Sequence, residues 1–109
     1  MHEFAFGTTT KNEKFGPARC AMDKERSAGG SSGGSGGCVG LGTVPIAIGT
    51  DTGGSIRVPS TSNGAVGYKP TINRWPSDYG IKMSHFRDTC GPIGVSVEDI
   101  ALTDSVVSG

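Results

Sequence analysis

A serine that follows two glycines is the residue best placed in this sequence to act as a nucleophile. The segment Thr50–Arg57 reads TDTGGSIR, a polar turn between two apolar segments, with Ser55 directly after Gly53 and Gly54. Glycines carry no side chain, so the backbone at these positions can approach a substrate carbonyl group closely. On the residues alone Ser55 is a candidate nucleophile, and the alternative is an ordinary glycine-rich turn with a surface serine.

The same turn offers backbone donors that could stabilise a developing negative charge. An oxyanion hole is built from N–H groups that point at the oxygen of a tetrahedral intermediate. The candidate donors are four consecutive N–H groups, those of Thr52, Gly53, Gly54 and Ser55. A phosphate-binding loop is poorly supported, because the pattern GxxxxGK[ST] does not occur around these glycines.

Short apolar runs on both sides of the turn predict strands. Pro45–Gly49 and Cys90–Val95 are apolar and bounded by turn residues, which is typical of strands buried on both faces. Val66–Lys69 could form a third strand. The polar turn would then follow directly on the first of these strands and would place Ser55 at a corner between strand and turn.

Two helices are predicted close to these strands. Val58–Asn63 could form a short helix with Pro59 in its first turn, where proline is well tolerated. A second helix is expected to begin after Ser96, a good N-cap residue, and to run through Val107. Strands that alternate with helices indicate an α/β architecture.

The N-terminal part of the chain is polar and rich in turn residues. Met1–Gly7 could be the end of a helix, and Gly16–Pro17 is expected to form a turn within an irregular stretch. Gly29–Gly37 reads GGSSGGSGG, which by composition alone is a flexible linker. Cys38–Val44 is small and apolar and could form a closely packed helix.

Composition limits the size of the core and the kinds of partner. The chain has 109 residues, of which 34% are hydrophobic and 19 are glycine, so we expect one small domain with a thin core. Ten basic and ten acidic side chains cancel, which argues against nucleic acid or a membrane as a partner. Three cysteines without CxxC spacing argue against a disulfide framework or a zinc site and favour a cytoplasmic protein.

Two long motifs dominate the middle of the chain. They are GGSSGGS at Gly29–Ser35 and PIAIGTDTGGSIRVPS at Pro45–Ser60. Four further segments flank them: MHEFAFGTTT at Met1–Thr10, GPAR at Gly16–Arg19, GAVGYKPT at Gly64–Thr71 and DTCGPIGVSVEDIAL at Asp88–Leu102.

Together these motifs resemble the amidase signature family of amide hydrolases. The resemblance implies that residues 1–109 are a partial amidase-signature domain with the signature at 29–71 and no second domain. It also implies an α/β fold with a mixed β-sheet core covered by helices, and no metal or organic cofactor.

The resemblance assigns catalytic roles to two serines. Enzymes of the family use a Ser–Ser–Lys triad, and the matching motifs imply that Ser55 is the nucleophile and Ser31 the bridging serine, which follows a cis peptide bond. In the implied mechanism a neutral lysine takes a proton from Ser55 through Ser31, and Ser55 attacks the amide carbon to give an acyl-enzyme. Water then releases the acid, after ammonia or an amine has left.

The lysine of this triad has no match in the sequence. In the family it lies in an earlier strand, well upstream of the GGSS motif, whereas Met1 is only 30 residues before Ser31. Lys11 and Lys14 lie in a polar loop, and Lys69 belongs to the GYKPT motif. We therefore expect a fragment of a longer domain, inactive by itself. The alternative is a natural miniature protein that kept the motif and lost the chemistry.

Supporting residues and the substrate class are also implied by the resemblance. Asp51 and Arg57 are expected to hold the nucleophile loop, and Ser32 to hydrogen-bond within the triad network or to cap the following helix. Trp75–Pro76 and Phe86–Thr89 resemble the branch that hydrolyses arylacetamides such as indoleacetamide and mandelamide. The expected function is hydrolysis of such a small-molecule amide, and a homodimer of the full-length enzyme is compatible with the resemblance. The alternatives are an inactive structural or binding module and an ammonia-producing amidotransferase subunit that needs partner chains.

Overall fold

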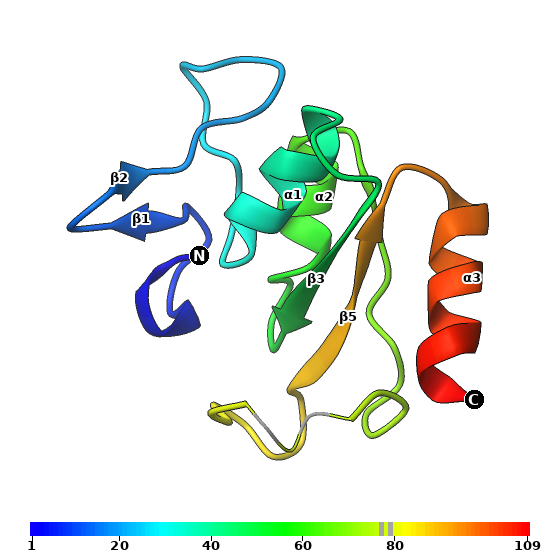
Figure 1. Ribbon diagram of the computed structural model, residues 1–109. Coiled ribbons are helices and arrows are strands. Elements are labelled where there is room, and N and C mark those ends of the chain that lie inside the picture. Colours follow the sequence, from blue (N-terminus) through cyan, green and yellow to red (C-terminus); the bar gives the residue numbers. More distant parts are fainter. Residues whose placement is uncertain (77, 79) are drawn as a thin grey trace.

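A three-stranded antiparallel sheet forms the centre of the computed structural model, which describes residues 1–76, 78 and 80–109. Across the sheet the order is β3 (Ile46–Asp51), β5 (Thr89–Gly94) and β4 (Val66–Gly67), so β5 is the middle strand. Figure 1 shows β3 and β5 side by side. All three predicted strands are present. β3 extends beyond Gly49, however, so Thr50 and Asp51 belong to the strand and not to the turn.

The place of each strand in the sheet decides how well it is covered. β5 pairs with β3 on one side and β4 on the other, and all of its residues are buried except the half-buried Cys90. The predicted burial is therefore confirmed for β5. It is wrong for β3, because β3 lies at an edge of the sheet and the side chain of Ile48 is 52% exposed.

Three α-helices pack against the two faces of the sheet: α1 (Gly33–Gly40), α2 (Arg57–Ser62) and α3 (Val97–Ser108). α1 and α2 lie side by side on one face, and α3 lies on the other (Figure 1). The predicted cap of α3 is confirmed, because Ser96 Oγ accepts the N–H of Asp99 at 3.1 Å. None of the helices in the described ranges is long and apolar enough to cross a membrane.

The glycine-rich segment is helical, so the linker interpretation is wrong. α1 takes up most of GGSSGGSGG and ends at Gly40, before the predicted end at Val44. A Cβ atom on Gly40 would lie 2.5 Å from the carbonyl oxygen of Asn63, at the end of α2. A Cβ atom on Gly36 would lie 2.9 Å from the carbonyl oxygen of Pro59. Glycine disfavours a helix by about 1 kcal/mol relative to alanine, but here it allows the two helix backbones to touch.

The N-terminal segment forms a small hairpin in place of the predicted irregular stretch. β1 (Lys11–Asn12) pairs with β2 (Gly16–Pro17), so Gly16–Pro17 is a strand and not a turn. Asn12 holds the turn between them, because its Oδ1 accepts the N–H of Phe15 at 2.9 Å. In Met1–Gly7 the expected helix end is a single 3-10 turn at Glu3–Ala5.

The buried apolar core is small, as the composition predicts. Its centre is formed by Val39 of α1, Ile56 before α2 and Ile93 of β5. On the opposite face of the sheet, α3 buries Ile100 but leaves Leu102 and Val106 exposed. The core therefore holds α1, α2 and β5 together. Because Ile56 belongs to the core, the segment between β3 and α2 is also fixed in place.

Candidate active site

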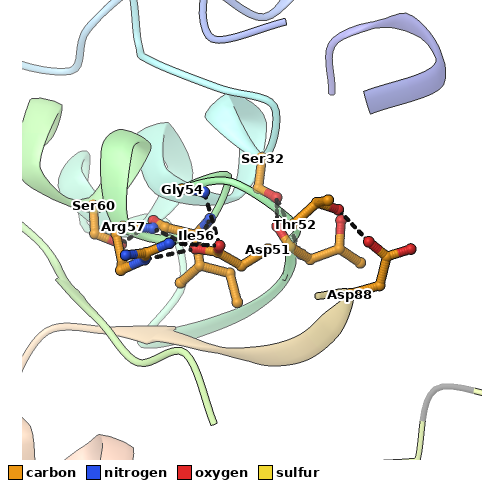
Figure 2. Close-up of polar contacts among 9 residues, drawn as sticks. Ser32, Asp51, Thr52, Gly54, Ile56, Arg57, Ser60 and Asp88 are labelled. Carbon is orange, nitrogen blue, oxygen red and sulfur yellow. Dashed lines mark hydrogen bonds and ion pairs between the residues drawn. The ribbon is translucent and has the colours of Figure 1, made fainter. Parts of the chain in front are cut away.

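The turn at 52–56 joins β3 to α2 and carries the half-buried Ser55. Asp51, the last residue of β3, is fully buried and organises this turn. Its Oδ1 accepts the N–H of Gly54 at 2.8 Å, and its Oδ2 accepts the N–H of Ile56 at 3.1 Å (Figure 2). The chain therefore wraps around one carboxylate before α2 begins.

Arg57 binds the same carboxylate through its guanidinium group. Its Nε donates to Oδ2 of Asp51 at 3.0 Å and its Nη2 donates to Oδ1 at 2.9 Å, a bidentate pair. Burial raises the pKa of Asp51, but hydrogen bonds from Arg57 and from the N–H groups of Gly54 and Ile56 outweigh it and lower the pKa below its ordinary value. Asp51 is thus a charged, fully bonded group under the turn, and both predicted supporting residues make these contacts.

The contact between Gly54 and Asp51 bears on the predicted oxyanion hole. It occupies the N–H of Gly54, one of the four predicted donors. The N–H groups of Thr52, Gly53 and Ser55 have no partner among the described residues. Gly54 has a φ of +126°, which side-chain-bearing residues rarely adopt, so the turn requires glycine at this position. Three of the four predicted donors therefore make no hydrogen bond to the described residues.

The GGSS segment lies directly beside this turn. The N–H of Ser32 donates to the carbonyl oxygen of Ser55 at 3.2 Å, and the N–H of Thr50 donates to Ser32 Oγ at 3.2 Å. Ser32 makes no side-chain cap on α1, so its hydroxyl serves β3 instead. Ser31 is fully buried and follows a cis peptide bond from Gly30. Ser31 Oγ has no hydrogen-bond partner in the part of the chain that the structure describes.

Thr10 supports this segment and was not found by reasoning from the sequence. Its buried hydroxyl donates to the carbonyl oxygen of Gly29 at 2.7 Å and accepts the N–H of Gly33 at 3.0 Å. The hydroxyl thus spans the residues on both sides of Ser31. Thr10 ends a run of three threonines, and nothing in that run distinguishes it from Thr8 and Thr9.

The described residues present no evident metal site. Across residues 1–76, 78 and 80–109, no group of three or more His, Cys, Asp or Glu side chains is placed to hold an ion. Asp51 and Arg57, which contact the turn at 52–56, are bonded to each other, and Asp88 accepts a hydrogen bond from the hydroxyl of Thr52 in the same turn. The groups at and beside this turn that could take part in a reaction are the hydroxyls of Ser55 and Ser31 and the N–H groups of Thr52, Gly53 and Ser55.

Known proteins match the whole chain in sequence and in fold. The family model described as Amidase matches residues 1–109. The chain belongs to the amidase family. A solved structure described as the crystal structure of amidase superimposes on all of this amidase-family chain with a TM-score of 0.96 at 45% identity, and the match covers 25% of that structure's chain. The resemblance inferred from the motifs and the predicted α/β fold are both confirmed.

Two curated relatives of this amidase-family chain carry different names. Mandelamide hydrolase from Pseudomonas putida is 50% identical over 114 residues, which covers the whole chain and 22% of that protein. A glutamyl-tRNA(Gln) amidotransferase subunit from a Sulfurihydrogenibium species is 47% identical over 110 residues, again the whole chain and 22% of the relative. The chain therefore spans less than a quarter of the length of these two relatives.

Proposed function

We propose that the protein carrying this chain hydrolyses a carboxylic amide to an acid and ammonia or an amine, with Ser55 as the nucleophile. The observation that carries the proposal is the placement of the two serine motifs. The backbone bond from Ser32 to Ser55 holds the GGSS segment on the nucleophile turn. Next to it, Ser31 Oγ is buried without a partner among the described residues. Leaving a buried hydroxyl unbonded costs about 1–3 kcal/mol, and a role in proton transfer accounts for such a group.

The proposed chemistry follows from these positions and from the family resemblance. Ser55 Oγ attacks the amide carbon while its proton passes to Ser31 Oγ, and the proton of Ser31 passes to the lysine that the resemblance implies. The oxyanion accepts hydrogen bonds from the free N–H groups of Thr52, Gly53 and Ser55. The proton then returns to the leaving nitrogen, and ammonia or an amine departs from the acyl-enzyme on Ser55. Water hydrolyses this ester by the same relay.

An arylacetamide is the proposed substrate class. It is supported by the similarity to mandelamide hydrolase and by the short Trp75–Pro76 and Phe86–Thr89 motifs. The Trp75 side chain is only 3% exposed, and its Nε1 donates to Asp104 on α3 at 2.9 Å. Trp75 therefore ties its loop to α3 and is not assigned to substrate contact. The substrate class rests on similarity along the sequence and not on a pocket in this chain.

A role within an amidotransferase is the second candidate function, favoured by the 47% identity to the glutamyl-tRNA(Gln) amidotransferase subunit described above. Such a subunit would release ammonia for use by partner chains. The two candidates share Ser55 and differ in substrate. Purified protein should therefore be assayed with mandelamide, indoleacetamide, a short aliphatic amide and glutamine, each alone. Turnover of glutamine and of no other amide would favour the second candidate.

The nucleophile assignment is tested in the protein expressed from its complete reading frame. A fluorophosphonate should label Ser55, and Ser55→Ala should abolish both labelling and amide hydrolysis. Ser105→Ala is a matched control, because Ser105 is an exposed serine on α3. It should label and turn over like the parent. Labelling or hydrolysis that persists in Ser55→Ala would overturn the assignment, and a parent protein with neither property would show an inactive module.

A further inference from the structure

Asp88 lies beside the turn at 52–56, at the same end of the sheet. It immediately precedes β5, whose first residue, Thr89, pairs with Asp51 at the end of β3. The next residue on the β3 side is Thr52, and its Oγ1 donates to Oδ1 of Asp88 at 2.5 Å (Figure 2). The first side chain of the nucleophile turn is therefore anchored to the start of the middle strand.

The second oxygen of the same carboxylate binds a different segment. Oδ2 of Asp88 accepts the N–H of Met83 at 2.6 Å and the N–H of Ser84 at 2.8 Å. These residues belong to the loop that precedes β5. Burial raises the pKa of Asp88, but the hydrogen bonds from Thr52, Ser84 and Met83 outweigh it and lower the pKa. The carboxylate is thus charged near neutral pH, and each oxygen holds one segment.

We infer that Asp88 is a positioning residue for the oxyanion hole and that it couples the loop containing Met83 and Ser84 to Thr52. The inference rests on the proposed function, because it takes the N–H of Thr52 as a donor to the oxyanion. The hydroxyl that Asp88 holds and this N–H belong to one residue, so fixing the side chain restrains the direction of the N–H. Preorganised donors of this kind act only when their positions are set before the reaction. Asp88 touches neither Ser55 nor Ser31 in the contacts that the structure shows.

The hydrogen bond from Thr52 to Asp88 and the hydrogen bonds from the loop to Asp88 can be tested with separate substitutions. Thr52→Val keeps the shape of the side chain and removes only the hydroxyl, whereas Thr52→Ser keeps the hydroxyl. Asp88→Asn removes the charge and one of the two acceptor oxygens. If the remaining oxygen keeps the two N–H groups of the loop, the side-chain NH2 group can only donate to Thr52 Oγ1, so both sets of hydrogen bonds lose their charge assistance. Asp104→Asn is the matched control, because Asp104 ties Arg74 and Trp75 to α3 and lies on the other face of the sheet from α1 and α2.

The rate at which a fluorophosphonate phosphonylates Ser55 measures how well the oxyanion hole stabilises the developing negative charge. This measurement needs no amide substrate. We expect Thr52→Val and Asp88→Asn each to lower this rate about tenfold, which is less than the 10²–10³-fold loss typical of a deleted oxyanion donor. The double variant should be no slower than the slower single variant, because the two changes break one linkage. Thr52→Ser and Asp104→Asn should label at close to the parent rate. With an amide substrate, the loss should fall on kcat and leave KM nearly unchanged.

Three outcomes would overturn the inference: labelling of Thr52→Val at the parent rate, additive losses in the double variant, or an equal loss in Asp104→Asn. Backbone amide chemical shifts of Gly53 and Ser55 provide a second measurement that needs no activity. Both Thr52→Val and Asp88→Asn should shift these two signals, and unchanged signals would also overturn the inference. If the parent protein lacks reactivity at Ser55, the proposed function fails, and the chemical shifts still decide whether Asp88 positions the turn.

Discussion

The N–H of Ser32 donates a hydrogen bond to the carbonyl oxygen of Ser55 at 3.2 Å. This bond joins two residues that are separated in the sequence by α1 and β3. Because Ser31 directly precedes Ser32, its position relative to Ser55 is set by backbone contacts and not by the side chains that would react. The two serines can therefore be changed one at a time without dismantling the arrangement.

Substitution of Ser31 should separate activity from stability. Ser31→Ala removes the proposed relay hydroxyl, so turnover should fall by about 10²- to 10⁴-fold. Its Oγ is buried without a hydrogen-bond partner among the described residues, so Ser31→Ala should be as stable as the parent or more stable, by up to about 1–3 kcal/mol. Steady-state kinetics and thermal unfolding of the same preparation measure both effects.

Ser32→Ala provides the matched comparison at the neighbouring position. Ser32 Oγ accepts the N–H of Thr50, so this variant should lose about 1 kcal/mol of stability. A loss of turnover below tenfold in Ser31→Ala would make Ser31 a spectator. A large drop in the unfolding temperature of Ser31→Ala would instead indicate a structural role.

Lowering the pH should destabilise the folded protein at the turn 52–56, because Asp51 becomes protonated. The pKa of Asp51 in the folded protein is lowered, so the folded state favours the charged form. The resulting stability is present above the pKa of the unfolded chain, about 3.9, and is lost as the pH falls through the lower pKa of the folded state. Asp51→Asn should therefore be less stable than the parent at neutral pH, and the difference should shrink below about pH 4.

Thermal unfolding of the parent and Asp51→Asn over a series of pH values measures this dependence. Glu98→Gln serves as the control, because Glu98 is an exposed carboxylate on α3. Its unfolding temperatures should follow those of the parent across the series. A constant difference between the parent and Asp51→Asn at every pH would show that the charge on Asp51 does not stabilise the fold.

The contact between α1 and α2 predicts opposite effects for two glycines of one helix. At Gly40 a Cβ atom would lie 2.5 Å from the carbonyl oxygen of Asn63, whereas at Gly34 it would have no atom within 4 Å. Gly40→Ala should therefore destabilise the protein by about 1–3 kcal/mol through overpacking. Gly34→Ala should be neutral or stabilising, by at most about 1 kcal/mol, because alanine favours a helix. Chemical denaturation measures both, and equal effects would contradict the close approach of the helices.

Local patterns in the sequence predicted the helices whose beginnings are set by their own residues. Ser96 is a good N-cap, and the helix begins after it. Pro59 is tolerated early in a helix, and α2 contains it in that position. The glycine-rich segment was misjudged on composition because its helix depends on a partner. α1 exists where glycines let α2 approach, and composition alone does not show that partner. The burial of β3 was overestimated for a related reason, since an apolar run does not reveal whether its strand lies in the middle or at the edge of a sheet.

The candidate site could be predicted only as far as the motifs reached. Ser55, Ser31, Asp51 and Arg57 lie within the two long motifs. Asp51, Ser55 and Arg57 meet at one turn, and the bond from Ser32 to Ser55 places the segment of Ser31 beside it. Thr10 and Asp88 act through hydrogen bonds that link segments far apart in the sequence, from Thr10 to Gly29 and from Thr52 to Asp88. A threonine or an aspartate that makes such contacts leaves no periodicity or spacing to detect. The three-dimensional contact was needed to recognise both residues, and it was also needed to show that Gly54 donates to Asp51.

The 109-residue chain by itself is predicted to be catalytically inactive and only marginally folded. The lysine that the family resemblance implies has no match in it, so the relay through Ser31 lacks its final proton acceptor. The apolar core depends on few side chains, while Leu102 and Val106 of α3 are 65% and 75% exposed. Exposed apolar helix faces favour aggregation. Circular dichroism should show a broad, weakly cooperative thermal transition, and assays with aryl and aliphatic amides should show no turnover. A sharp transition together with turnover that disappears in Ser55→Ala would show a self-sufficient small amidase and would contradict this prediction.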